Sequence, residues 1–193
     1  SYIALIVTTI IFPLYYQGVL HVSPFVSGMA LVPGAVFLSI LNPLSGKLAD
    51  KIGFKPTMLV RMVMIICGWL VGLTMLSRLS LVAMILCAMI IEGGNAFVMM
   101  PAATLGANSL PDKLVPHGTA VITTVRQVLG SAGVAVATIV LTVASEHALS
   151  AGSKPLAANL HGYYLVFIMM VVIELVGLVL AVMLKNTKKQ GAK

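Results

Sequence analysis

The sequence is poor in charged side chains and in cysteine. Only 9% of its 193 residues are charged and 60% are hydrophobic, whereas about a quarter of the residues in an ordinary soluble domain are charged. Cys67 and Cys87 both fall inside apolar runs, at a spacing that suits no metal site, so we expect them to pack as small apolar residues. The shortage of charge excludes a soluble domain, because a chain of this size cannot hide so much apolar surface from water.

The sequence contains long apolar runs. A membrane-spanning helix needs roughly 20 mostly apolar residues, and six such runs can be drawn. We therefore predict an all-α membrane bundle of six transmembrane helices over residues 1–184, followed by a basic tail at residues 185–193. A hydrophilic loop is expected at residues 146–162. The predicted spans are 2–20, 24–44, 57–76, 81–105, 118–145 and 163–184.

The net charge of +7 is distributed unevenly between the predicted loops. Lys and Arg near helix ends resist translocation, so the more basic side of a membrane protein is usually cytoplasmic. If both termini are cytoplasmic, Arg78 and Lys154 are the only basic loop residues on the outer side. Because the positive charge is explained by membrane orientation, we expect no nucleic acid partner. The basic residues on the cytoplasmic side are then Lys47, Lys51, Lys55, Arg61, Lys113, Lys185, Lys188, Lys189 and Lys193.

A few polar residues inside the spans form the candidate substrate and proton cavity. A charge at the bilayer centre costs roughly 2.5–3.5 kcal/mol on insertion scales, and such residues usually face a cavity or a partner. Glu92 either pairs with Arg126 and locks two helices together, or lines a cavity and exchanges a proton for a cationic substrate. Asn95 lies one turn after Glu92. Tyr16 and Gln17, near the outer end of the first span, form either an aromatic belt or a cavity wall.

Two further residues invite a specific interpretation. Trp69, near the outer third of the third span, is expected to anchor that helix at the membrane interface. Glu174 lies in the middle of the sixth span among apolar neighbours. It is either neutral and packed, or faces a helix that this sequence does not contain.

Several motifs resemble signatures of a known family of transporters. Gly46-Lys-Leu-Ala-Asp50-Lys51-Ile-Gly53-Phe-Lys55 resembles the loop signature of the major facilitator superfamily, in the copy that follows the second helix of the C-terminal half. The run 118–133, which contains Arg126-Gln127, is similar to a signature of the EmrB/QacA-type fourteen-helix drug:proton antiporters. The segments 97–101 and 13–17 are similar to the same subfamily.

The resemblance implies an architecture. The six helices would be the C-terminal bundle of a two-bundle major facilitator fold, built as a 3+3 inverted repeat, with the first and fourth helices lining the cavity. The second and fifth helices would flank the cavity and the third and sixth would lie outside. It also implies that a cytoplasmic gating loop latches this bundle against the partner bundle. The residues of that loop are Gly46, Asp50, Lys51, Gly53 and Lys55.

The function expected from this resemblance is transport. The chain would be the C-terminal half of a proton-coupled exporter of drugs or other amphipathic or cationic small molecules, working by alternating access in the cell membrane. Its partners would be the substrates, protons, the lipid bilayer and a missing N-terminal bundle of the same or a second chain. The alternative is a half-transporter or channel that acts as a dimer. We expect no cofactor and no enzymatic activity, because His21, His117, His147 and His161 lie at predicted helix ends or in loops, away from intramembrane chemistry.

Overall fold

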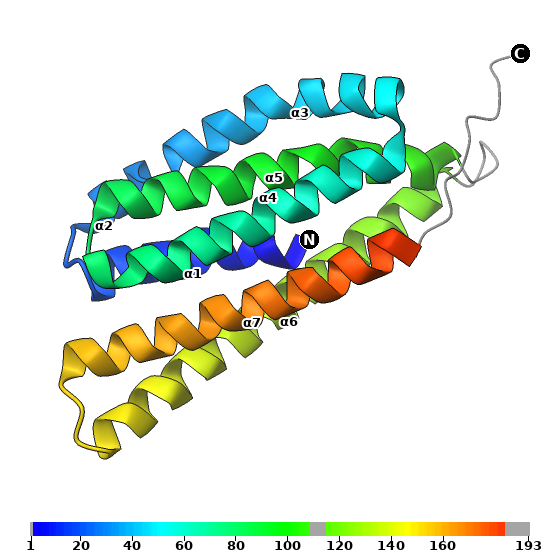
Figure 1. Cartoon of the computed structure of the whole chain (residues 1–193). Helices are drawn as coiled ribbons and strands as arrows, with labels where there is room; N and C mark the ends of the chain where they lie inside the picture. Colours follow the sequence, from blue (N-terminus) through cyan, green and yellow to red (C-terminus); the bar gives the residue numbers. More distant parts are fainter. Residues whose placement is uncertain (1, 109–114, 184–193) are drawn as a thin grey trace, which may run out of the picture.

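The computed structural model describes residues 2–108 and 115–183, which form a bundle of helices running side by side (Figure 1). The predicted basic tail at residues 185–193 lies outside the described residues. The helices are α1 (Tyr2–Gly18), α2 (Pro24–Met29), α3 (Val32–Ile52), α4 (Phe54–Met75), the short 3-10 turn η1 (Leu76–Arg78), α5 (Leu81–Asn108), α6 (Val115–Ser150) and α7 (Pro155–Met183).

The bundle has two ends, which we name after a residue in a turn at each. The Gly53 end holds the turn between α3 and α4, and the Leu79 end holds the turn between η1 and α5. Gly53 alone separates α3 from α4 and has a φ of 92°, which glycine adopts without strain. The charged segment predicted as a loop is therefore helical through Ile52. Hydropathy did not predict the helical state of this charged segment, because a helix can continue beyond the apolar layer of the membrane while its residues become polar.

The α6–α7 hairpin also departs from the sequence prediction. Helix α6 continues to Ser150 and α7 begins at Pro155, so most of the hydrophilic loop expected at residues 146–162 is helical. The polar residues of this segment extend α6 and α7 beyond their apolar parts. In Figure 1 the turn of this hairpin stands apart from the turn between α1 and α2.

The contacts between helices fit a 3+3 repeat, in which the first helix of each triplet packs against the second helix of the other triplet. Helix α1 packs against α6, and α5, its counterpart in the second triplet, packs against α3, the counterpart of α6. Helices α1 and α5 also contact each other, as do the third members of the triplets, α4 and α7. In this arrangement α5 contacts α1, α3 and α4.

An aromatic cluster joins α1, α4 and α7 in the core. The rings of Phe12 and Phe167 stack with centroids 5.6 Å apart, and Trp69 meets Phe167 edge-on at 4.9 Å. Trp69 is fully buried, so the prediction that it anchors α4 at the membrane interface is wrong. Its large ring fills the space between three helices, where it removes more apolar surface from contact with lipid or water than an interfacial position would.

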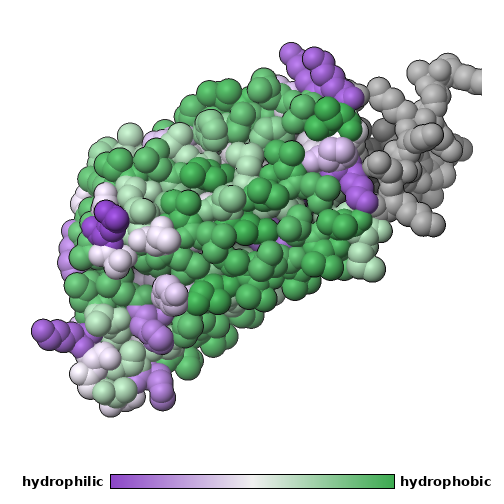
Figure 2. All heavy atoms as spheres, in the orientation of Figure 1, coloured by the Kyte–Doolittle hydropathy of each residue, from purple (hydrophilic) through white to green (hydrophobic). Residues whose placement is uncertain are grey.

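The outer surface of the bundle is apolar between two hydrophilic ends. Ile40, Val128 and Val179 are examples of large apolar side chains that are about 60% exposed. Figure 2 shows apolar residues over most of the face drawn, with hydrophilic residues gathered toward the two ends. Exposed apolar surface of this extent suits contact with lipid.

Length and hydropathy identify four candidate spans within the described residues. Tyr2–Gly18 and Leu81–Phe97 are shorter apolar helices, so the predicted count of six transmembrane helices stays a prediction. The four longer stretches are Pro24–Ala49, Lys55–Arg78, Pro116–Ser150 and Pro155–Met183.

Helices α4 and α5 approach each other through glycines. A Cβ atom built at Gly94 would lie 2.5 Å from Cγ1 of Ile65 and 3.2 Å from the Arg61 carbonyl oxygen. At Gly68 it would lie 2.6 Å from Cγ1 of Ile91. Small residues permit such close backbone approach in membrane bundles, where packing replaces the hydrophobic effect as the main attraction between helices.

Replacing Gly94 with alanine should therefore separate α4 from α5. We expect Gly94→Ala to lower the free energy of unfolding by about 1–3 kcal/mol, the usual range for overpacking. The measurement is denaturation of the purified protein in mixed micelles by titration with SDS. Gly28→Ala is the control, because nothing lies within 4 Å of a Cβ atom at that position. Equal stability of the two variants would contradict the close contact.

Candidate functional site

Glu92 lies at the contact between α5 and α3. A Cβ atom built at Gly34 in α3 would lie 3.3 Å from Cγ of Glu92, and the glutamate side chain is partly exposed. The neighbouring Gly93 faces Phe37 and Leu41 of the same helix. Glu92 is thus a carboxyl group in a span-like segment, held between two helices and still open on one side.

Asn95 lies deeper than Glu92. Its side chain is 4% exposed, and its Nδ2 atom has no hydrogen-bond partner among the described residues. The preceding Gly94 packs on the backbone of Arg61 in α4. The two predicted cavity residues of α5 therefore differ in environment: Glu92 borders α3 and the surface, whereas Asn95 is in the interior.

Arg126 of α6 contacts α1 rather than Glu92. Its guanidinium carbon lies 5.4 Å from the centroid of the Tyr2 ring, a cation–π geometry. Gly130 and Gly133 of α6 face Tyr2 and Ile3 of α1, which brings the two helices close enough for this contact. Among the ion pairs of the described residues, none joins Glu92 to Arg126, so the alternative of a buried pair between them is wrong in this structure.

The structure instead associates Arg61 with Glu174. Both side chains are 1% exposed and lie where α4 packs on α7, since a Cβ atom built at Gly177 would lie 3.2 Å from Cε of Met62, the neighbour of Arg61. Their opposite charges are close enough to attract each other. The placement of Arg61 on the cytoplasmic side stays a prediction, and the structure adds that its side chain is buried in the bundle. Glu174 is packed, as one alternative held, and its electrostatic neighbour belongs to this chain.

Tyr16 and Gln17, adjacent in sequence, have different surroundings. Tyr16 is fully buried in the aromatic cluster, with its ring edge-on to Phe12 and Tyr15. Gln17 is exposed, and its Nε2 atom donates a hydrogen bond to Oγ of Ser27 at 3.1 Å. In this conformation Tyr16 contacts other side chains on all sides, and only Gln17 reaches a cavity.

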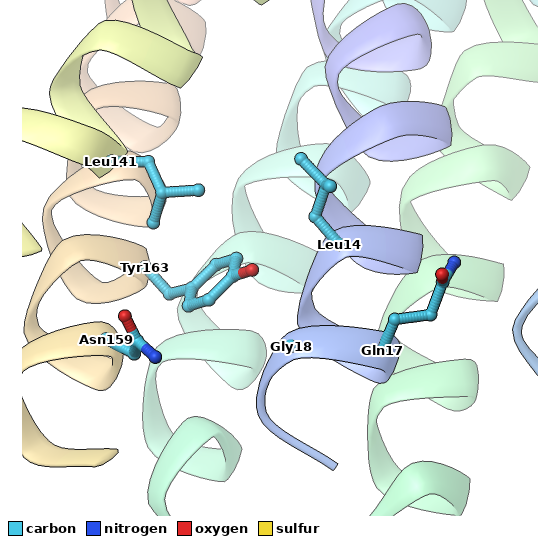
Figure 3. Close-up of a pocket in the computed structure, with 6 residues that line it drawn as sticks. All are labelled: Leu14, Gln17, Gly18, Leu141, Asn159 and Tyr163. Carbon is cyan, nitrogen blue, oxygen red and sulfur yellow. The ribbon is translucent and has the colours of Figure 1, made fainter. Parts of the chain in front are cut away.

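That cavity is a pocket of about 430 Å³ at the Leu79 end. Figure 3 shows its walls, which come from the end of α1, from α6 and from the start of α7. Sequence reasoning missed its polar residues on α7, although Asn159 and Tyr163 are one turn apart and so share a face. The lining residues are Leu14, Gln17, Gly18, Leu141, Asn159 and Tyr163.

The predicted gating loop spans the end of α3 and the start of α4. Gly46 lies within α3, Lys51 is exposed in its last turn, and Gly53 makes the reversal. Lys55 donates a hydrogen bond from Nζ to the carbonyl oxygen of Val182 at 2.6 Å. This hydrogen bond connects the start of α4 to α7. The side chain of Asp50 lies outside the described residues.

The bundle, its apolar surface and its few interior charges together define a multi-pass membrane protein. Residues 1–134 match the family model described as Major Facilitator Superfamily. The chain therefore belongs to this superfamily, and the resemblance carried by the 46–55 motif is confirmed at that level.

Curated relatives show what kinds of protein the chain is similar to. It is 36% identical over 185 residues to the "Uncharacterized MFS-type transporter YcnB" of Bacillus subtilis, covering 96% of this chain and 39% of the relative. It is 32% identical over 197 residues to the "Lincomycin resistance protein LmrB" of Listeria monocytogenes, covering 97% and 41%. A "Multidrug resistance protein B homolog" of Mycobacterium tuberculosis is 26% identical over 140 residues, covering 72% and 26%. The chain thus spans about two fifths of the length of the first two relatives.

The electrostatic association of Arg61 with Glu174 can be tested by removing one charge or both. We expect Glu174→Leu alone to lower the free energy of unfolding by about 3–5 kcal/mol, because it leaves a buried guanidinium without its compensating charge. The double variant Arg61→Met with Glu174→Leu should recover most of that loss. SDS titration in mixed micelles measures both.

Glu146→Gln is the control for loss of a carboxylate, since Glu146 is exposed at the far end of α6. Its unfolding should match that of the unmodified protein. Arg61→Met alone completes the cycle. If the loss of stability in the double variant equalled the sum of the losses in the two single variants, the two charges would be independent and the association would be refuted.

Proposed function

We propose that the chain is the C-terminal six-helix half of a proton-coupled exporter of drugs or other amphipathic or cationic small molecules. Family membership and the names of the resistance relatives support this proposal. The observation that carries it is Glu92, a partly exposed carboxyl group in an apolar helix, held against Gly34 of a neighbouring helix. The protein acts as a carrier without enzymatic chemistry and works by alternating access in the cell membrane.

Polar groups exposed on α1 and α6 support a location for the other half of the transporter. Thr9 and Gln17 are exposed on α1, and Thr123 and Gln127 on α6. Exposed amides are unfavourable against lipid, where no water is available to them, so such groups usually face protein or an aqueous cavity. Because α1 and α6 contact each other, we assign the second bundle and the substrate path to the side of these two helices.

Glu92 supplies the exchange step in this proposal. A carboxyl group that is partly removed from water can hold a proton or a cationic group, but one site does not hold both equally well. Proton entry from one side of the membrane would then release a cation bound at the same oxygen atoms. Asn95, one turn further along α5, contributes uncharged hydrogen bonds deeper in the bundle. Arg126 keeps the α1–α6 region positive.

The Gly53 end is cytoplasmic in this proposal, together with both termini. Lys47 and Lys51 are exposed there, and basic residues near helix ends favour the cytoplasmic side. The segment from Gly46 to Lys55 then gates the cytoplasmic opening. Lys55 binds α7 of the same chain, which leaves Asp50 and Lys51 for the second bundle. A carboxylate can bind the positive N-terminal end of a helix there.

Replacing Glu92 tests the exchange step directly. In inside-out vesicles carrying the full-length transporter, we expect Glu92→Gln to abolish proton release driven by a cationic drug. The glutamine keeps the size of the side chain but cannot ionise. The measurement is the fluorescence of a pH indicator dye after addition of the drug.

Glu146→Gln is the matched control and should leave proton release unchanged. If Glu92→Gln lost cationic substrates but still coupled uncharged ones to protons, Glu92 would recognise charge without carrying the proton. Unchanged coupling together with unchanged handling of cationic drugs would refute both roles.

Asp50→Asn tests the gating segment. We expect the transport rate to fall at least tenfold with little change in substrate affinity, because the gate acts on the conformational cycle and not on the binding site. Equilibrium binding of radiolabelled substrate and vesicle uptake measure the two quantities separately. A large loss of binding with a normal rate of conformational exchange would contradict a gate.

A further inference from the structure

The pocket at the Leu79 end, to which Gln17 contributes, has features of a small-molecule site that does not involve Glu92. Its volume of about 430 Å³ falls within the roughly 300–1,000 Å³ typical of small-molecule sites. The pocket lies near the end of α1. Glu92 is on α5, which does not line the pocket, and it contacts α3. The pocket is therefore separate from the region assigned to proton exchange.

The hydroxyl group of Tyr163 is aimed into this space. The side chain is 5% exposed, whereas the adjacent Tyr164 is 47% exposed, so only Tyr164 has the outward position of an interfacial tyrosine. In Figure 3 the Tyr163 hydroxyl points toward α1, and a Cβ atom built at Gly18 would lie 3.8 Å from it. Within the described residues this hydroxyl makes no hydrogen bond.

A chain of contacts fixes the orientation of Tyr163. Its ring meets Tyr15 edge-on with centroids 5.3 Å apart. Tyr15 is itself held by a hydrogen bond of 2.8 Å from its hydroxyl to the carbonyl oxygen of Leu76. The Tyr163 hydroxyl is thus positioned before any ligand arrives, which lowers the entropic cost of binding.

The chemistry of the lining defines the ligand. Asn159 lies one turn before Tyr163 on α7, and in Figure 3 its amide lies near the base of the Tyr163 ring, whereas the hydroxyl at the far end of the ring points toward α1. The apolar side chains of Leu14 and Leu141 also line the pocket. The amide of Gln17 is directed to Ser27. No charged residue is among the described residues that line the pocket. Such a site offers hydrogen bonds and apolar contact but no ion pair.

We propose that this pocket binds an uncharged amphipathic molecule, whose hydroxyl or carbonyl group bonds the Tyr163 hydroxyl while its apolar part contacts Leu14 and Leu141. Asn159 offers a second polar contact. This site is independent of the proposed exchange at Glu92. A free small molecule and an uncharged lipid such as a diacylglycerol share this chemistry.

Photolabelling tests the proposal in the full-length protein, reconstituted in vesicles of phosphatidylethanolamine and phosphatidylglycerol. The probe is a fatty alcohol that carries a diazirine, and an alkyl trimethylammonium of the same length with the same diazirine is its charged counterpart. Mass spectrometry locates the labelled peptides. We expect the alcohol to label peptides containing residues 14–18 and 159–163, and the cation to leave them unlabelled.

Two variants address the pocket by different means. Leu141→Trp should abolish labelling by filling the space. Tyr163→Phe should weaken labelling about three- to tenfold at limiting probe, as loss of one hydrogen bond predicts, while keeping the ring against Tyr15. Tyr164→Phe removes a hydroxyl on the exposed side of the same helix and should change nothing.

Competition identifies the source of the ligand. Displacement of the label by octanol added from water supports a free molecule, and displacement only by diacylglycerol built into the vesicles supports a lipid. Equal labelling by alcohol and cation would overturn the proposal, as would labelling that persists in Leu141→Trp or that misses both peptides. Because Glu92→Gln should leave the labelling intact, a failure here is distinguishable from a failure of the exchange step.

Discussion

The close approach of α4 and α5 is the constraint on which the rest of the bundle depends. Gly68 and Gly94 let the two backbones meet, and this contact places α5 between α4 and α3. One consequence is that Glu92 faces α3 while Asn95 lies in the interior, although only one turn separates them. Another is that Arg61, whose own backbone forms part of the contact, projects from α4 into the bundle. Backbone packing thus determines which polar groups are buried and which remain open.

Much of the fold could be predicted from the sequence because apolar runs and turn residues are local signals. The helical character of the predicted spans and the reversal of the chain near Gly53 follow from composition, although the segment before Gly53 is helical where a loop was expected. The errors lie where helices extend beyond the apolar layer, as at residues 146–162, because hydropathy responds to burial in lipid and not to helix formation. Trp69 was assigned to the interface since its type is common there, but three helices enclose it.

The candidate site was harder to predict because its contacts join distant helices. Glu92 and Arg126 are the most conspicuous charges in neighbouring spans, yet Arg126 contacts Tyr2. Arg61 lies near the end of its span, and its burial against α7, the helix that carries Glu174, depends on a contact between distant segments. Tyr163 has an adjacent tyrosine of the same chemistry, and only the packing of Tyr15 distinguishes the inward residue from the outward one.

The burial of Arg61 with Glu174 also has a consequence for how the protein is made. Arg61 is synthesised 113 residues before Glu174 (174 − 61), so α4 enters the membrane without the acidic group that compensates its charge. Insertion scales set the cost of a central arginine at roughly 2.5–3.5 kcal/mol, and an arginine nearer a helix end, such as Arg61, costs less. Helix α4 therefore reaches its final environment only when the last helix of the described chain is in place. Assembly of this bundle is completed from its C-terminal end, and a ribosome that stalls before α7 leaves a charged helix among lipids.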